Sequence, residues 1–148
     1  MSAADCYYFW SLPRYECGLV LGNSVSLNQV SVIVYLKFFL LTCLLESIFY
    51  FAFGKFQKLT LIQILKQVLV LNLATHPIVF FVFPYFLEKT GSDIFTYIWT
   101  AEFFAFAIEA MILKLYYRYS WRSAVWASGL ANLFSWSVGI WLQTLGLL

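Results

Sequence analysis

Long apolar runs separated by short polar breaks fill the chain from residue 31 onward. Four runs, at residues 31–53, 59–87, 93–117 and 122–145, are each long enough to cross about 30 Å of hydrocarbon, which takes a helix of about 20 residues. The breaks are so short that consecutive helices must lie antiparallel. No run alternates polar and apolar residues as the strands of a membrane barrel do. The pattern therefore predicts an all-α integral membrane protein, an antiparallel bundle of four transmembrane helices.

The first thirty residues differ from the rest of the chain. Residues 1–30 carry Asp5, Pro13 and Glu16, and they lack the basic start and continuous apolar stretch of a secretory signal. We expect an extramembrane or interfacial segment that precedes a transmembrane domain at 31–148. A start codon assigned too far upstream is the alternative.

Composition agrees with the membrane interpretation and excludes other classes. The chain is 63% hydrophobic and 11% charged, whereas soluble domains carry about 25% charged residues. A net charge of +2 is too small to indicate nucleic-acid or other polyanion partners. Three cysteines do not form a disulfide scaffold. Cys6 and Cys17 could pair outside the membrane, and Cys43 is expected as a small core residue.

Local backbone signals mark the helix ends and one point within the second span. Gly54 can adopt the left-handed conformation that closes a helix, and Asp93 and Ser120 stand at N-cap positions. Pro77 cannot donate a hydrogen bond to the carbonyl of Leu73, which leaves an acceptor free beside polar side chains. We expect a bend or hinge at Pro77, although a tolerated kink without a moving part is the commoner case.

Orientation follows from the basic residues, which concentrate on the cytoplasmic side of membrane proteins. Six of the nine lie near the connector of helices 1 and 2 or that of helices 3 and 4. These are Lys55, Lys58, Lys66, Lys114, Arg118 and Arg122, and the other side has Arg14, Lys37 and Lys89. The distribution predicts that both of these connectors are cytoplasmic and that both termini lie outside.

Ionisable and amide side chains lie at similar depths in different spans. Each charge at bilayer depth costs about 2.5–3.5 kcal/mol, so such residues need an explanation. A rise of about 1.5 Å per residue from the middle of each span sorts them into three levels. The levels pair His76 with Glu102, Asn72 with Asn132, and Glu46 with Glu109. We expect these side chains to converge on one internal site.

Two interpretations of these residues remain open: a chemical role, and a structural role in holding the helices together. Glu46 and Glu109 at one level would share a proton, hold a cation between them, or face water. His76 and Glu102 would form an ion pair or a proton relay. Asn72 and Asn132, by contrast, are more often bridges that hold helices together than groups that take part in chemistry. The acidic residues and His76 are therefore the main functional candidates.

Cofactor signals are weak. The Glu-x-x-His pairs of di-iron bundles are absent, which argues against a metal centre, and a single His76 is little support for haem or chlorophyll. The sequence also has no nucleophile motif and no phosphate-cradling glycine loop. The metal and cofactor content stays undetermined at this stage.

Three stretches carry a resemblance to a known group of proteins. They are the segment from Asn72 to Pro77, the acidic pair Glu102 and Glu109 with the alanine that follows, and the segment from Ser128 to Ser135. Here the chain resembles a group of small bacterial four-span membrane proteins of uncharacterised activity. The resemblance covers about residue 59 to the C-terminus. It implies a bacterial inner-membrane location and no particular activity.

These observations favour a small protein that handles protons, a cation or a small polar solute at its buried carboxylate, histidine and amide groups. Four helices enclose little space, so translocation would need a homo-oligomer. The rival hypothesis is an accessory subunit that packs against a larger membrane complex through its aromatic faces. A membrane-embedded enzyme that acts on lipid is a weaker third hypothesis.

Overall fold

The computed structural model describes residues 32–83 and 94–147, and over these residues the chain is entirely helical. Helix α2 covers Val32–Phe56, and α3 covers Leu61–Pro77 and continues into the π-helical turn η3, Ile78–Val82. Helices α5 and α6 cover Ile94–Leu115 and Trp121–Thr144. The predicted all-α fold class with four helices is confirmed for this part of the chain. Residues 1–30, with Cys6 and Cys17, lie outside it, as does Asp93.

Two of the helical segments are long and apolar enough to cross a membrane: Tyr35–Phe56 and Leu61–Val82, each of 22 residues. The described helices follow the apolar runs closely, because a run of this length can satisfy its backbone polar groups without water only as a helix. Helix α2 ends at Phe56, three residues beyond the predicted end of the first span at residue 53.

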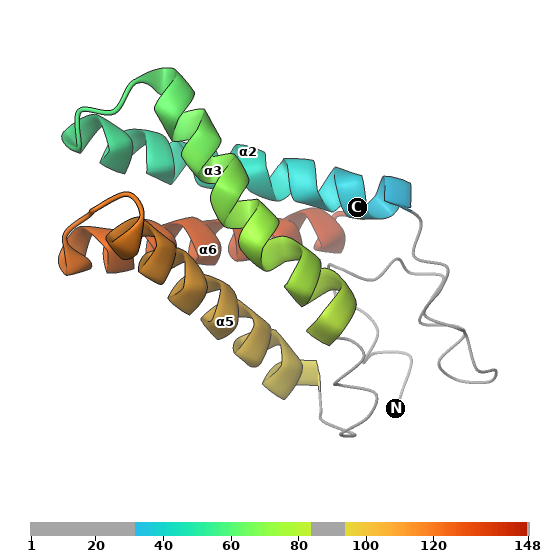
Figure 1. Ribbon diagram of the computed structural model, residues 1–148. Helices are drawn as coiled ribbons and strands as arrows, with labels where there is room; N and C mark the ends of the chain where they lie inside the picture. The colour runs from blue at the N-terminus through green and yellow to red at the C-terminus, as the bar shows by residue number, and fades with distance from the viewer. Residues whose placement is uncertain (1–31, 84–93, 148) are drawn as a thin grey trace, which may run out of the picture.

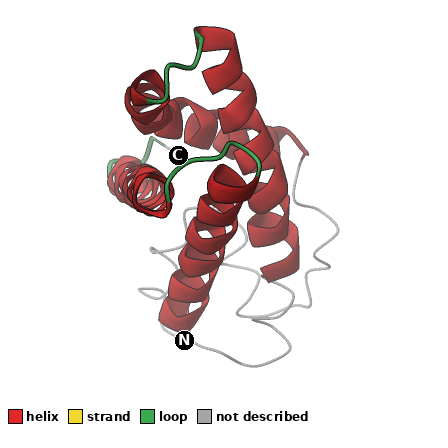
Figure 2. Ribbon diagram, turned by 60° about the vertical axis from the view of Figure 1, so that its left-hand side comes forward, coloured by secondary structure: helices red, strands yellow, loops and turns green. Residues whose placement is uncertain are grey.

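The helices form two antiparallel hairpins that pack side by side. Both connectors, α2 to α3 and α5 to α6, lie at one end of the molecule, while α2 begins and α6 ends at the other (Figure 1). Figure 2 brings the connector end forward and shows the two loops as separate turns. Helix α2 packs against α3 and α6, and α5 packs against α6 and α3. Every helix therefore contributes one face to a common interior.

Side-chain caps fix where the second helix of each hairpin begins. Thr60 and Gln63 form a capping box: the Thr60 hydroxyl accepts from the backbone N–H of Gln63 at 3.3 Å, and the Gln63 side chain accepts from the Thr60 N–H at 2.8 Å. The hydroxyl of Ser120 accepts from the N–H of Ser123 at 3.1 Å, as its N-cap position predicted. Each cap satisfies backbone donors that the first helical turn leaves without partners.

Gly54 has a different role from the predicted one. It lies within α2, and the left-handed residue of that connector is Lys58, with φ of 59°. An added Cβ at Gly54 would lie 2.6 Å from Cγ1 of the buried Ile64. Gly54 is therefore required for the close approach of α2 and α3. The residue type alone could not distinguish this role from that of a glycine that closes a helix.

Pro77 changes the hydrogen-bond pattern of its helix without ending it. The N–H of Ile78 donates to the carbonyl of Thr75, and the N–H of Phe83 donates back five residues to Ile78. A proline in a helix removes one donor and crowds the preceding turn, so the regular hydrogen-bond pattern of the helix is interrupted here. A π-helical turn thus follows Pro77 directly, and the hinge predicted there stays a prediction.

The apolar core lies nearest the connector end and uses small residues on one helix. Tyr50, Ile64 and Leu113 are fully buried against a row of alanines of α6, Ala124, Ala127 and Ala131. Small side chains let neighbouring helices approach closely. Cys43 is a free, half-buried thiol that packs against this core, as expected.

Replacement of Gly54 with alanine tests the close approach of α2 and α3. Overpacking a core costs about 1–3 kcal/mol, and the gain in helix propensity returns about 1 kcal/mol. We expect Gly54→Ala to lower the thermal unfolding midpoint of the purified protein. Gly129→Ala is the matched control, because its Cβ would meet Phe106 at an ordinary 3.5 Å. Equal midpoints for the two variants would contradict the packing described here.

Candidate functional site

Eight polar side chains from all four helices meet in the interior, and we call them the carboxyl–amide cluster. They are Glu46 and Tyr50 on α2, Thr75 and Asn72 on α3, Glu109 on α5, and Ser128, Asn132 and Ser135 on α6. None of the eight is more than 7% exposed. A group this deeply buried must find its hydrogen-bond partners within the protein.

Glu109 is hydrogen-bonded to side chains of the three other helices. The Tyr50 hydroxyl of α2 and the Asn132 amide of α6 both donate to its Oε2, each at 2.6 Å. The Ser128 hydroxyl lies 3.3 Å from the same oxygen. The Thr75 hydroxyl of α3 lies 3.2 Å from Oε1. This one carboxyl therefore links all four helices.

Glu46 makes a smaller set of the same contacts. The Asn72 amide of α3 donates to its Oε2 at 2.7 Å, and the Ser135 hydroxyl of α6 lies 3.3 Å from its Oε1. Sequence reasoning expected the two asparagines to face each other at a central level. The structure instead gives each asparagine a glutamate on the preceding helix of its own hairpin, because an asparagine and a glutamate side chain together span one helical turn.

Both asparagines use both amide hydrogens. The second hydrogen of Asn72 reaches the carbonyl of Val68 at 3.2 Å, and that of Asn132 reaches the carbonyl of Ser128 at 3.0 Å. An amide with both donors occupied is fixed in rotation, so its oxygen and nitrogen cannot exchange places. The asparagines thus act as interhelical bridges and, at the same time, orient the two carboxyls.

Within the described residues, neither Glu46 nor Glu109 forms an ion pair. Their donors are amides and hydroxyls, all of them neutral. Burying an unpaired charge costs far more than burying a neutral polar group. Chemically, the arrangement is suited to carboxyl groups whose charge is removed by a proton.

His76 and Glu102 do not form the predicted pair in the described part of the chain. The His76 ring packs at 5.4 Å from Tyr35 and 5.6 Å from Phe39, between ring centroids, and its Nδ1 has no hydrogen-bond partner. Successive residues turn by about 100° around a helix. Thr75 therefore faces Glu109 of α5, whereas His76 faces the aromatic side chains of α2.

Sequence reasoning missed Tyr50, which donates to Glu109. The signal was available, because Tyr50 follows Glu46 by four residues and so lies on the same helix face. It also missed a second polar pair nearer the connectors, in which the hydroxyl of Tyr119 donates to Gln67 at 3.2 Å. Burial raises the pKa of the Tyr119 phenol, so it stays protonated and remains a donor.

The cluster does not resemble a metal site. No group of three His, Cys, Asp or Glu residues in the described part of the chain could hold a metal ion. Comparisons with protein-family models, with curated proteins and with solved structures gave no match. The function of this protein must therefore be argued from the geometry of the cluster.

Asn132→Ala tests how much the amide contributes to the fold. The variant removes a 2.6 Å bond to Glu109, and the net contribution of one hydrogen bond to stability is about 1 kcal/mol. We expect a clearly lower thermal midpoint in detergent or lipid. Ser137→Ala is the control, since its hydroxyl contacts the carbonyl of Leu133 on its own helix and is solvent- or lipid-facing. A midpoint as high as that of the control would show that the amide does not hold Glu109.

Proposed function

We propose that the chain is a multi-pass protein of the bacterial inner membrane whose Glu46 and Glu109 carry exchangeable protons. The observation that supports this proposal is that both carboxyls are buried and bonded to neutral donors from several helices. The proton site would serve the movement of protons or of a small polar solute coupled to them.

Large apolar side chains on the outer faces support four membrane spans. Helices α2 and α3 are long and apolar enough to cross a membrane. Helices α5 and α6 also expose large apolar side chains along their length. These include Trp99, Phe103, Met111 and Leu115 on α5 and Val125, Trp126, Leu133 and Trp141 on α6. Soluble monomers rarely expose contiguous apolar patches larger than a few hundred Å². Lipid is the solvent that would suit these faces.

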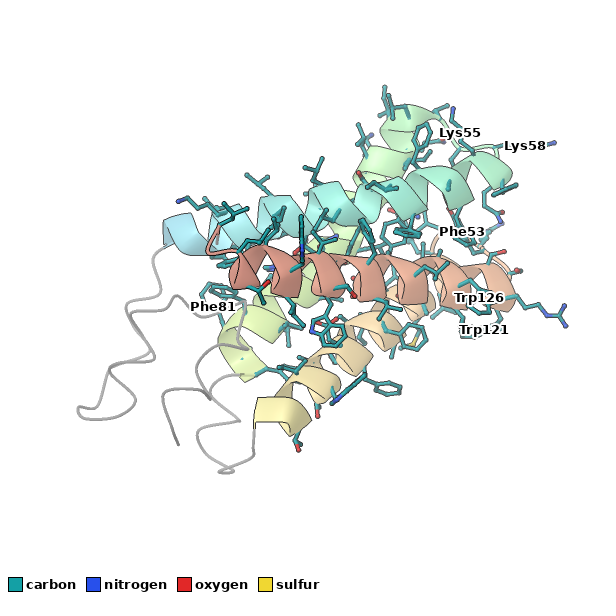
Figure 3. The ribbon with its side chains drawn as sticks, turned by 180° about the vertical axis from the view of Figure 1, so that it is seen from behind. Phe53, Lys55, Lys58, Phe81, Trp121 and Trp126 are labelled. Atoms are coloured by element: carbon teal, nitrogen blue, oxygen red, sulfur yellow. The ribbon has the colours of Figure 1, made fainter. Side chains whose placement is uncertain are left out.

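The distribution of charge supports cytoplasmic connectors. Lys55 and Lys58 lie at the same end as Trp121 and Trp126, while Phe81 lies toward the opposite end (Figure 3). The Lys55 ammonium lies 5.2 Å from the ring centre of Phe51. Lysine over an aromatic ring is typical of a membrane interface, where the stem is buried and the charge reaches water. The resemblance to small bacterial four-span proteins agrees with this arrangement.

A proton fits the cluster better than a metal cation. Ca²⁺ requires six to eight oxygen ligands and Mg²⁺ about six. Oε2 of Glu109 already receives the hydrogens of Tyr50 and Asn132, and Oε2 of Glu46 receives one from Asn72. These hydrogens would point at a cation and repel it. A proton, by contrast, needs no additional space and no further ligands.

A second candidate function is that of an accessory subunit in a larger membrane complex. The observation in its favour is the concentration of exposed aromatic side chains on α5 and α6, such as Phe103, Trp126 and Trp141. A subunit would be inert alone and would co-purify with its partners. A proton carrier, in a homo-oligomer, would be active alone in liposomes.

Glu109→Gln tests the proton site, because glutamine has nearly the shape of a protonated glutamate but cannot exchange its proton. We expect the variant to fold and insert normally and to lose pH-driven flux in liposomes loaded with a pH-sensitive dye. Ser47→Ala is the matched control, since Ser47 follows Glu46 directly and contacts the carbonyl of Leu44 on its own helix. Normal flux through the Glu109→Gln variant would reduce Glu109 to a packing residue.

A fusion reporter tests the orientation. If the connectors are cytoplasmic, alkaline phosphatase fused after residue 148 is exported and active, whereas green fluorescent protein at the same point does not fluoresce. The reverse pattern would place the C-terminus in the cytoplasm and overturn the proposed topology.

A further inference from the structure

The two helical hairpins match each other position by position in their second helices. Helix α3 begins one residue after its cap Thr60, and α6 begins one residue after its cap Ser120. Counting sixty residues on from α3 takes Asn72 to Asn132 and Thr75 to Ser135. In both helices the amide and the hydroxyl are buried and stand three residues apart.

The connectors match as well. Lys58 has φ of 59° and Arg118 has φ of 58°, and they are the non-glycine residues with positive φ in the described part of the chain. Each stands two residues before the cap of the following helix, sixty positions apart. Left-handed residues other than glycine are uncommon, so the shared conformation marks a shared turn. Two unrelated hairpins with short loops would not need a left-handed residue at the same position before the cap.

The first helices match with an offset of sixty-three residues. Buried positions of α2 recur at every fourth residue, at Phe38, Thr42, Glu46 and Tyr50. The corresponding buried positions of α5 are Ala101, Ala105, Glu109 and Leu113. Glutamate occupies the third position in both series. The side chains around it differ in size and polarity, so the correspondence is one of position rather than of sequence.

The hydrogen bonds repeat with the same atoms. In each hairpin an asparagine Nδ2 donates to a glutamate Oε2, at 2.7 Å for Asn72 and Glu46 and at 2.6 Å for Asn132 and Glu109. Between the hairpins, Thr75 of the first contacts Oε1 of Glu109 at 3.2 Å. Ser135 of the second contacts Oε1 of Glu46 at 3.3 Å. An exchange of the hairpins therefore maps these four contacts onto one another.

From this repetition we infer that the cluster is a two-fold site made of two equivalent proton-binding units, one glutamate per hairpin, which together take up two protons. The inference rests on the proposed function and adds its stoichiometry. Each unit consists of a glutamate, the asparagine of its own hairpin and the hydroxyl of the other hairpin. Each hairpin is therefore incomplete without the other.

The hydroxyl groups account for one proton on each carboxyl. A hydroxyl has a single hydrogen to donate. Thr75 lies 3.1 Å from the carbonyl of Leu71, and Ser135 lies 3.1 Å from that of Asn132. When Glu109 and Glu46 are protonated, their O–H groups donate to these hydroxyls, whose hydrogens then serve the carbonyls. When a glutamate is ionised, the neighbouring threonine or serine hydroxyl can donate its single hydrogen to the carboxylate or to the backbone carbonyl, but not to both.

Two departures from the two-fold pattern distinguish the units. The Ser128 hydroxyl lies 3.3 Å from Oε2 of Glu109, while the matching position of α3 is a valine. Tyr50 gives Glu109 a donor at 2.6 Å, while Leu113, at the matching position of α5, cannot donate to Glu46. The carbonyl bond of the Glu109 carboxyl is therefore weakened by more hydrogen bonds than that of Glu46. The two groups should absorb at different infrared frequencies, which allows them to be counted separately.

Infrared difference spectroscopy on the full chain in lipid bilayers, in H₂O and D₂O, tests the two-proton site. We expect Glu46→Gln and Glu109→Gln each to remove one band of a protonated carboxyl, with the Glu109 band at lower frequency. The double variant should remove both, with twice the loss of intensity. Ser137→Ala should remove none.

The other outcomes separate the inference from the proposed function. If the two single variants remove the same band, the carboxyls share one proton; the two-proton site is then wrong, and the proton site stands. If neither variant removes a band, both carboxyls are ionised and the proposed function fails as well. Tyr50→Phe covers the case in which the glutamine variants do not fold. It should shift the lower-frequency band upward and leave the other unchanged, and no shift would contradict the assignment.

Discussion

Two carboxyl groups, buried among four helices and without an ion-pair partner in the described part of the chain, are the constraint on which the rest of the structure depends. Because a bare carboxylate is costly there, each needs hydrogen bonds from neutral donors. The asparagines, hydroxyls and Tyr50 meet the first need. The alanines of α6 and Gly54 meet a second need, which is the close approach of the helices. Only small residues allow four helices to come close enough for these short polar side chains to touch.

The sequence was sufficient to predict the helices and to bring two of the acidic residues together. Apolar runs of more than about 20 residues leave helix as the structure that satisfies the backbone, and a fixed rise per residue converts a position into a depth. Glu46 and Glu109 were placed at one level in this way, and the structure brings both into one cluster. The short breaks likewise predicted antiparallel neighbours.

The direction of each side chain around its helix could not be predicted in the same way. Asn72 and His76 lie one turn apart and both seemed suited to the site, yet His76 packs among aromatic rings of α2. Which helix lies opposite which face depends on how the hairpins pack. Gly54 illustrates the same limit, because a glycine that ends a helix and one that admits a neighbouring side chain look alike in sequence.

The repetition of the hairpins was also hidden in the sequence, because matched positions such as Tyr50 and Leu113, or His76 and Trp136, have different side chains. What the halves share is the geometry of turns, caps and buried polar atoms. Solid-state NMR of the protein in lipid bilayers, with ¹³C in glutamate and ¹⁵N in asparagine side chains, tests the shared contact directly. The account predicts through-space correlations of Glu46 with Asn72 and of Glu109 with Asn132, as their 2.7 Å and 2.6 Å bonds require. The absence of both correlations in well-resolved spectra would contradict it.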